Sequence, residues 1–221
     1  MKHRLTPKDL IESDDFELLA EVDHLHIKQF IFEQIAREKE LIRLYSIYQI
    51  SMIALFLFLL VKGIVLYTKG ISQPVIAMAG AVLFAFTLLI VLHELIHAGA
   101  FLLRGTGKVQ FGAIWSKFIF YAGVDQKVID YPTFRFVALA PFWVVKAVSL
   151  LGAILFWSGS LAYFFISLMC IHSLFCAGDL AMLAFYKLHP DKEIYNYDDL
   201  SQRKTFFYFR KTNTIWRDDR K

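Results

Sequence analysis

The sequence predicts an all-α membrane protein with about four transmembrane helices, a small β-hairpin between the second and third, and an N-terminal amphipathic helix. Hydrophobic residues make up 57 % of the 221 residues, and the mean hydropathy of +0.48 is far above that of a typical soluble domain. Apolar runs long enough to cross a bilayer follow one another between residues 46 and 188. We therefore expect a four-span membrane domain at 46–188, a cytoplasmic polar or amphipathic helical segment at 1–45, and a cytoplasmic basic and aromatic tail at 189–221.

The N-terminal segment is expected to be helical. Between His26 and Leu44, apolar residues recur at roughly helical spacing, with charged residues between them. The apolar positions are Ile27, Phe30, Ile31, Ile35 and Ile42. This pattern predicts an amphipathic helix that lies on the membrane or packs on the protein, and a helix that binds a partner is the alternative.

The spans follow from uninterrupted apolar composition. We expect them at about 46–67, 74–103, 134–157 and 161–187, with Pro141 able to bend the third. The first span carries one charge, Lys62, close enough to the span end for its amine to reach the interface. In the loop at 104–131, apolar and other residues alternate from Val109 to Trp115 and another apolar run follows to Tyr121, which predicts a β-hairpin.

The distribution of charge predicts the orientation. Nearly all Lys and Arg that flank the spans lie on the side that holds both termini and the 104–131 loop. This side is therefore expected to face the cytoplasm. The membrane is expected to be the inner membrane of a bacterium. The net charge of +4 is spread along the chain, which fits contact with the lipid bilayer and excludes a nucleic-acid partner. Cys170 and Cys176 both lie in the last apolar run, so a disulfide framework is not expected.

A metal-binding pattern ends the second apolar run, at His93-Glu94-Leu95-Ile96-His97. Two histidines four residues apart project from one face of a helix, one turn apart, and can occupy two corners of a tetrahedral Zn²⁺ site. Glu94 is then placed to act as the general base toward water at that site. Ionisable residues in a membrane span are costly, which favours a functional role for all three.

A third ligand is needed, and Asp179 is the acidic residue other than Glu94 within the predicted spans. Counted from the cytoplasmic ends of their spans, His97 and Asp179 differ in depth by only about 3 Å. An ion pair of Asp179 with Lys146 is the structural alternative. His172 is expected as a hydrogen-bonded core or pore-lining histidine, about 10 Å from Asp179 along the helix. Cys176 is expected as a small buried residue, with a metal-ligand role less favoured.

These residues carry a resemblance. The His93–His97 motif in a membrane helix, Ala140-Pro141-Phe142 in the third span and the late Gly178-Asp179 together resemble a bacterial family of membrane zincin peptidases, which is similar to the site-2 proteases. The resemblance implies zinc held by His93, His97 and Asp179, with Glu94 as the base. The site-2 pattern usually has Asp-Gly in a stretch that contains Asn and Pro, whereas this chain has Gly178-Asp179.

The leading functional hypothesis is zinc-dependent hydrolysis of peptide bonds in membrane or membrane-proximal substrates, near the cytoplasmic face. The predicted hairpin offers a sheet edge on which an extended membrane protein or peptide substrate can lie. One alternative is a non-catalytic membrane protein with a structural or sensing metal site. Another is a small transporter in which His93, Glu94, His97 and His172 line a polar path.

Overall fold

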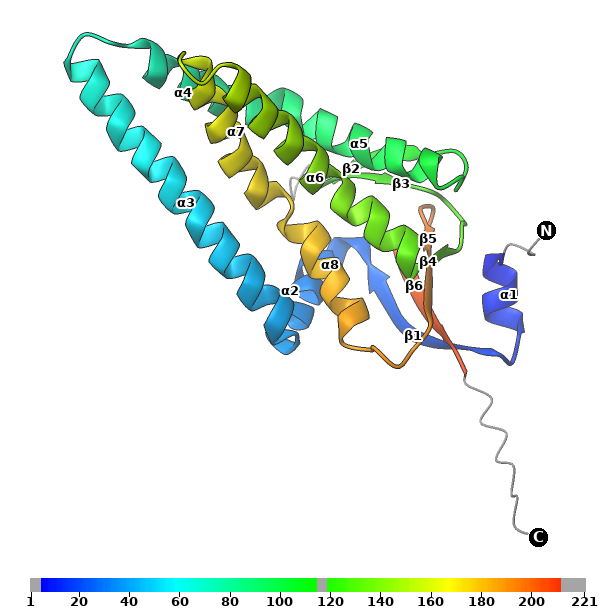
Figure 1. The fold of residues 1–221 in the computed structure, drawn as a ribbon. Helices are drawn as coiled ribbons and strands as arrows, with labels where there is room; N and C mark the ends of the chain where they lie inside the picture. The colour runs from blue at the N-terminus through cyan, green and yellow to red at the C-terminus, as the bar shows by residue number, and fades with distance from the viewer. Residues whose placement is uncertain (1–4, 115–118, 212–221) are drawn as a thin grey trace.

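The computed structural model describes residues 5–114 and 119–211 (Figure 1). The helices are α1 (Pro7–Glu12), η1 (His24–His26), α2 (Ile27–Arg37), α3 (Lys39–Thr68), α4 (Gln73–Phe84), the π-helical turn η2 (Ala85–Leu89), α5 (Ile90–Leu103), α6 (Tyr131–Leu155), α7 (Leu161–Phe175) and α8 (Ala177–Lys187). The strands are β1 (Phe16–Asp23), β2 (Gln110–Ile114), β3 (Ile119–Gly123), β4 (Ile129–Asp130), β5 (Ile194–Asp199) and β6 (Lys204–Arg210). The chain is therefore mostly helical, as the sequence predicts.

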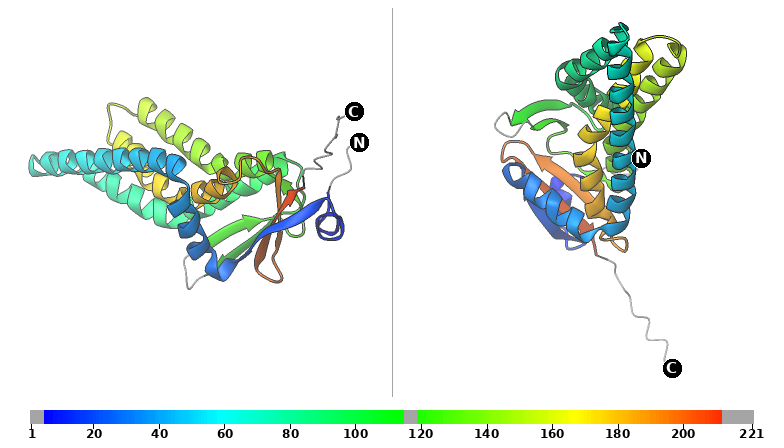
Figure 2. Two further views of the ribbon diagram at one scale, coloured as in Figure 1. Left: turned by 90° about the horizontal axis from the view of Figure 1, so that it is seen from below. Right: turned by 90° about the vertical axis from the view of Figure 1, so that its left-hand side faces the viewer.

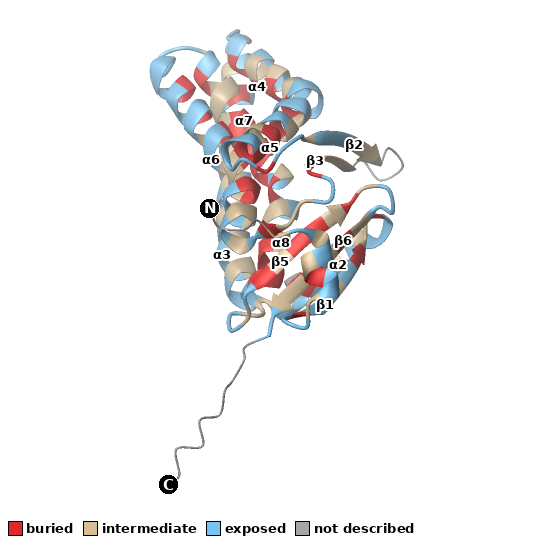
Figure 3. Ribbon diagram, turned by 90° about the vertical axis from the view of Figure 1, so that its right-hand side faces the viewer, coloured by how far each residue is buried: buried red, intermediate tan, exposed pale blue. Residues whose placement is uncertain are grey.

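Three helical segments are long and apolar enough to cross a membrane. They are α3, the continuous stretch of α4, η2 and α5 from Gln73 to Leu103, and α6. A fourth span exists if α7 and α8, which meet at an angle of 43°, are counted as one. Large apolar side chains on α3, such as Ile50, Phe58 and Val61, are exposed. Figure 3 colours each residue of the ribbon by how far it is buried. This distribution suits lipid contact and indicates a membrane protein.

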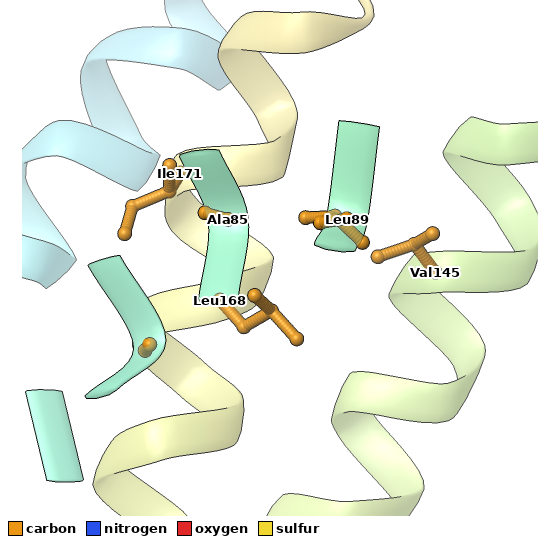
Figure 4. Packing of buried hydrophobic residues seen from close by; sticks show 6 residues of the cluster. Ala85, Leu89, Val145, Leu168 and Ile171 are labelled. Atoms are coloured by element: carbon orange, nitrogen blue, oxygen red, sulfur yellow. The ribbon is translucent and has the colours of Figure 1, made fainter. Parts of the chain in front are cut away.

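The helices enclose a core in which small residues allow close packing. Ala81, Ala85 and Leu89 of the second span meet Leu168 and Ile171 of α7, and Val145 of α6 closes the group (Figure 4). Ala81 and Ala85 are fully buried. Association of helices in lipid depends on this kind of close contact, because lipid is as apolar as the side chains themselves.

Gly152 of α6 lies directly against the ring of Phe165 on α7, and this contact gives a prediction for stability. A Cβ atom built on Gly152 would lie 2.6 Å from two ring atoms of Phe165. Gly152→Ala is therefore expected to destabilise the protein by about 1–3 kcal/mol, through overpacking. Thermal unfolding in detergent measures this. Gly80→Ala is the matched control, because its added Cβ would lie 3.9 Å from Phe164, and the change is expected to be neutral or stabilising by up to about 1 kcal/mol.

The predicted all-α class is incomplete, because both terminal segments contribute strands. An antiparallel sheet of order β1-β6-β5-β4 lies at one end of the helices (Figures 1 and 2). Residues 16–23, expected to be helical, pair with residues 204–210, which were expected to belong to a tail. The physical reason is long-range: Phe207 of β6 is fully buried against Phe185 and Tyr186 of α8. The sheet gains this apolar burial only when both terminal segments are present.

The amphipathic helix predicted around residues 26–44 is divided in the structure. α2 ends at Arg37 and α3 begins at Lys39, with Glu38 accepting a hydrogen bond from the backbone N–H of Leu41 as its N-cap. The ring of Phe30 on α2 lies 5.3 Å from that of Phe185 and 6.2 Å from that of Phe207. Of the two placements that the sequence allows, α2 thus packs on the protein.

The loop between the second and third spans contains the antiparallel pair β2–β3, with Gln110 opposite Gly123 and Ala113 opposite Phe120. The predicted hairpin also includes residues 115–118, which lie outside the described residues. β3 lies against α5. The strand pair is therefore positioned next to the helix that carries the histidine motif.

A buried polar cluster connects this pair to the terminal sheet. His24 donates from Nε2 to Thr205 Oγ1 at 3.0 Å, and Thr205 donates in turn to Asp198 Oδ1 at 2.6 Å. The ring of Tyr121 from β3 lies 6.0 Å from that of His24. Burial lowers the pKa of His24 and raises the pKa of Asp198, so the hydroxyl of Thr205 joins two groups that burial drives toward their neutral forms.

Candidate metal centre

His93 and His97 lie one turn apart on the inner face of α5, only 6 % and 8 % exposed. The π-helical turn η2 immediately precedes α5 in the same span, and π-helical turns occur often at functional sites. His97 Nδ1 lies 3.0 Å from the carbonyl oxygen of Val137 on α6. A carbonyl oxygen only accepts hydrogen bonds, so His97 carries a proton on Nδ1, and in the neutral imidazole its Nε2 is then free to bind a metal.

A break in the last apolar run brings the carboxylate to these histidines. α7 ends at Phe175 and α8 begins at Ala177, which places Asp179 in the first turn of α8. The Tyr45 hydroxyl of α3 donates to the carbonyl oxygen of Ser173, just before the break. Backbone groups freed inside a membrane need such a partner, and the N-terminus of a helix favours a negative charge. The break therefore both allows and stabilises the position of Asp179.

The three candidate ligand groups form a compact triangle, in which each histidine is nearest to a different oxygen of the Asp179 carboxylate. His97 Nε2 lies 3.1 Å from His93 Nε2, His93 Nε2 lies 3.3 Å from Asp179 Oδ2, and His97 Nε2 lies 3.4 Å from Asp179 Oδ1. Zinc bonds of about 2.0–2.1 Å at tetrahedral angles separate neighbouring ligand atoms by about 3.3 Å. The nearest-atom distances between the three groups are close to that separation, so the groups are spaced as zinc ligands are.

The chemistry of the three groups also calls for a cation. In its neutral form His97, with the proton on Nδ1, turns the lone pair of Nε2 toward the ring of His93 and the carboxylate. Asp179 Oδ2 is buried and makes no hydrogen bond of good geometry within the described residues, although His93 Nε2 lies 3.3 Å away. Buried lone pairs that face one another are costly, and a shared metal ion removes that cost.

Glu94 is held beside this triangle by the loop strands. Its side chain is half-buried, and the backbone N–H of Ala122 on β3 lies near its carboxyl group. It interacts electrostatically with His93, His97 and Asp179. A carboxylate in this position, next to three metal-ligating groups but not among them, is suited to accept a proton from water.

His172 is buried and hydrogen-bonded, which agrees with the expectation of a hydrogen-bonded core histidine. Its partner was not predicted: His172 Nε2 lies 3.0 Å from His93 Nδ1. Cys176 Sγ lies 3.7 Å from the other ring nitrogen of His172. The distance of about 10 Å expected along a straight helix does not describe how His172 and Asp179 lie, because the chain bends at Cys176. His172 contacts the side of the His93 ring that faces away from Asp179.

Two sets of metal-ligating groups therefore share His93. One is His93, His97 and Asp179, and the other is His93, His172 and Cys176, each with ligand atoms within 4.8 Å of one another. In the second set the His172 ring is the partner of both His93 Nδ1 and Cys176 Sγ, whereas the first set contains the buried Asp179 Oδ2, which makes no hydrogen bond within the described residues. We therefore interpret His172 as the partner that orients His93, and the first set as the candidate metal centre.

Lys146 does not take part in the centre. Its amine contacts the hydroxyl of Tyr48 on α3 and lies 4.2 Å and 4.8 Å from the ring centroids of Tyr48 and Phe142. The alternative of an ion pair between Lys146 and Asp179 is thus wrong, because Asp179 pairs with the two histidines. Cation–π contacts and the Tyr48 hydroxyl stabilise the Lys146 charge in place of a carboxylate.

The contact between His172 and His93 gives a second prediction. A group that orients a metal-ligating histidine typically contributes 10–100-fold to metal affinity, so His172→Ala is expected to weaken zinc binding by about that factor. A competition titration with a zinc chelator measures the change. His26→Ala, which removes an exposed histidine, is expected to leave the affinity unchanged. An unchanged affinity in His172→Ala would refute the orienting role.

The fold and the site define a membrane protein with a His-His-carboxylate centre and an adjacent glutamate. Residues 86–193 match the model of a family described as "Putative zincin peptidase". The matched stretch contains the histidine motif, the β2–β3 pair and Asp179. This match supports a zincin-type peptidase family, in which zinc is the expected metal. No curated protein and no solved structure matches the chain.

Proposed function

We propose that this protein is a zinc-dependent peptidase embedded in the membrane, with His93, His97 and Asp179 as the metal ligands and Glu94 as the general base. The observation that carries the proposal is the triangle of two imidazoles and one carboxylate, with nearest-atom distances of 3.1–3.4 Å, formed by α5 and the first turn of α8. The match to a family of zincin-type peptidases supports the same reaction class.

The residues of this chain divide the chemistry between them. When bound, zinc supplies Lewis-acid polarisation of a peptide carbonyl and lowers the pKa of a coordinated water to about 7. Glu94 accepts the proton of the attacking water and delivers it to the leaving amine. Val137 and His172 fix the orientations of His97 and His93 through hydrogen bonds to their Nδ1 atoms.

The proposed substrate is a membrane protein or membrane-proximal peptide in an extended conformation. A helix conceals its carbonyl groups in internal hydrogen bonds, so the cleaved segment has to be unwound. The β2–β3 pair supports this idea, because its strand β3 reaches Glu94 through the backbone of Ala122. A substrate strand that adds to this pair would run toward the metal centre.

The proposed setting is the inner membrane of a bacterium, with both termini and the terminal sheet in the cytoplasm. The excess of Lys and Arg on the side of the termini supports this orientation. The metal centre lies close to the end of α5 that joins the β2–β3 loop, so cleavage is proposed near the cytoplasmic face, where water has access.

One observation favours a second candidate, a non-catalytic structural or sensing metal site. Cys176 and His172 lie near His93, and a thiolate and an imidazole are good zinc ligands. If the protein rearranged so that either group joined the triangle, the metal would have four protein ligands. Structural zinc sites are closed in this way, whereas catalytic sites keep one open position.

Metal removal tests the proposed function. The protein is reconstituted in vesicles with membrane-anchored reporter peptides of varied sequence, and products are identified by mass spectrometry. We expect cleavage to stop after treatment with a zinc chelator and to return when zinc is added. Vesicles with chelator-treated protein and added Mg²⁺ serve as the control, because Mg²⁺ prefers oxygen ligands. Cleavage that persists without metal would refute the proposal.

A further inference from the structure

An open groove lies on the outer surface of the bundle, between α5 and α6. Its volume is about 740 Å³, and its walls are apolar except at one end. Gly99 and Leu103 of α5 face Leu139 and Trp143 of α6 across it. A Cβ built on Gly99 would meet no atom within 4 Å, so this glycine leaves the groove open. Trp143 is 61 % exposed and Leu103 is 81 % exposed.

Two arginines stand at the end of the groove nearest the β2–β3 loop. Arg104 is the C-cap of α5, and Arg135 lies in the second turn of α6. Within residues 5–114 and 119–211, neither makes an ion pair with a carboxylate within 4.0 Å. The guanidinium of Arg104 lies 4.4 Å from the centroid of the Phe136 ring, which holds it at the groove. The groove is thus apolar along its length and positively charged at its mouth.

We propose that this groove binds one anionic phospholipid, with the phosphate at Arg104 and Arg135 and an acyl chain between α5 and α6. A guanidinium binds phosphate through paired hydrogen bonds, and two of them match an anionic headgroup at the membrane interface. Along α6 the groove extends from Pro132 to Val144, which is about 18 Å of helix. One leaflet of the hydrocarbon core is about 15 Å thick, so an acyl chain fits the length.

The lining favours a lipid over a peptide. Apart from the two arginines, the side chains that line the groove are apolar. An extended peptide in this place would have no partners for its backbone N–H and C=O groups in the middle of the bilayer. An acyl chain has no such requirement. This inference does not rest on the proposed peptidase function, because the groove residues are separate from the metal ligands and from Glu94.

Trp143 provides a local reporter for the test. In a variant with Trp115, Trp157 and Trp216 replaced by Phe, Trp143 is the sole tryptophan. The protein is placed in phosphatidylcholine vesicles that contain either brominated phosphatidylglycerol or brominated phosphatidylcholine, since bromine quenches tryptophan only at short range. We expect half-maximal quenching at a mole fraction of brominated phosphatidylglycerol about 25-fold lower than that of brominated phosphatidylcholine, because each of the two arginines contributes about fivefold.

Two variants and a control separate the outcomes. R104Q/R135Q should abolish the preference for the anionic lipid, while R104K/R135K should keep part of it. Gly99→Leu should fill the groove and reduce quenching by either brominated lipid. Lys187→Gln removes an exposed charge on α8 and should leave the preference unchanged. Zinc content and the unfolding temperature verify that each variant is folded.

Three results would overturn the proposal. Equal quenching by the anionic and zwitterionic lipids would show that the arginines do not select a headgroup. A preference that survives in R104Q/R135Q would place the lipid elsewhere. A third result combines two observations: a reporter peptide prevents quenching of Trp143 by both lipids, and without the peptide neither lipid is preferred. This result would assign the groove to a peptide.

Discussion

Glu94→Gln is expected to lower the rate of peptide cleavage by about 10²–10⁴-fold, the usual contribution of a general base. The amide of glutamine has nearly the shape of the carboxyl group but does not accept a proton from water. Zinc content should stay at one ion per chain, because His93, His97 and Asp179 are unchanged. Single-turnover cleavage of a reporter peptide and metal analysis of the purified variant measure the two quantities.

Glu12→Gln is the control for this prediction, since Glu12 is an exposed carboxylate at the end of α1. It should cleave at the rate of the unmodified protein. Full cleavage by Glu94→Gln would contradict the general-base role. Loss of zinc together with activity would instead indicate that Glu94 supports the metal centre and is not the base alone.

Asp179→Asn is expected to weaken zinc binding by at least about 100-fold. Groups that only orient zinc ligands already contribute 10–100-fold, and the variant removes a negatively charged group of the triangle itself. Zinc should therefore raise the unfolding temperature of the unmodified protein but not that of the variant, since a ligand stabilises only the state that binds it. Without zinc the variant should be at least as stable as the unmodified protein, because it no longer buries a carboxylate.

The matched control is Asp191→Asn, which neutralises an exposed aspartate beyond the end of α8. Its zinc-dependent rise in unfolding temperature should equal that of the unmodified protein. An equal rise in Asp179→Asn would mean that Asp179 does not hold the ion. In that case His97→Ala, which removes an imidazole and keeps the carboxylate, should show whether the two histidines bind the metal without Asp179.

Much of the helical framework is predictable because it depends on local composition. A bilayer requires long apolar segments, so α3, the Gln73–Leu103 stretch and α6 can be recognised from hydropathy alone. The depth of a residue within such a segment also follows from counting along a helix. This is why Asp179 could be selected as a neighbour of His97, and the structure brings the two within 3.4 Å.

The terminal sheet could not be predicted in the same way, since its pairing partners are far apart in the chain. Phe16 pairs with Arg210, and Asp23 pairs with Lys204. A signal for β1 was nevertheless present: Phe16, Leu18, Ala20 and Val22 alternate with other residues, which is typical of a strand. This signal is weak, because only Phe16 and Val22 of the four are buried in the structure. A bulge also interrupts the register between Leu18 and Ala20.

The contact of His172 with His93 depends on tertiary structure that the sequence does not encode locally. The last apolar run predicts one continuous span, whereas the structure has a bend of 43° at Cys176. Gly178 near the bend is a weak signal, because glycine lowers helix stability. The carbonyl oxygen of Ser173 also needs Tyr45 from another helix as its partner. No pattern within residues 161–187 reveals that partner.

The most direct test of the account is X-ray absorption spectroscopy at the zinc edge of the purified protein. We predict one zinc per chain with only nitrogen and oxygen neighbours at about 2.0–2.1 Å, from two imidazoles, the Asp179 carboxylate and solvent. A sulfur neighbour at about 2.3 Å would show that Cys176 binds the metal, and a protein without zinc would show that there is no metal centre. Either result would contradict the proposed peptidase site.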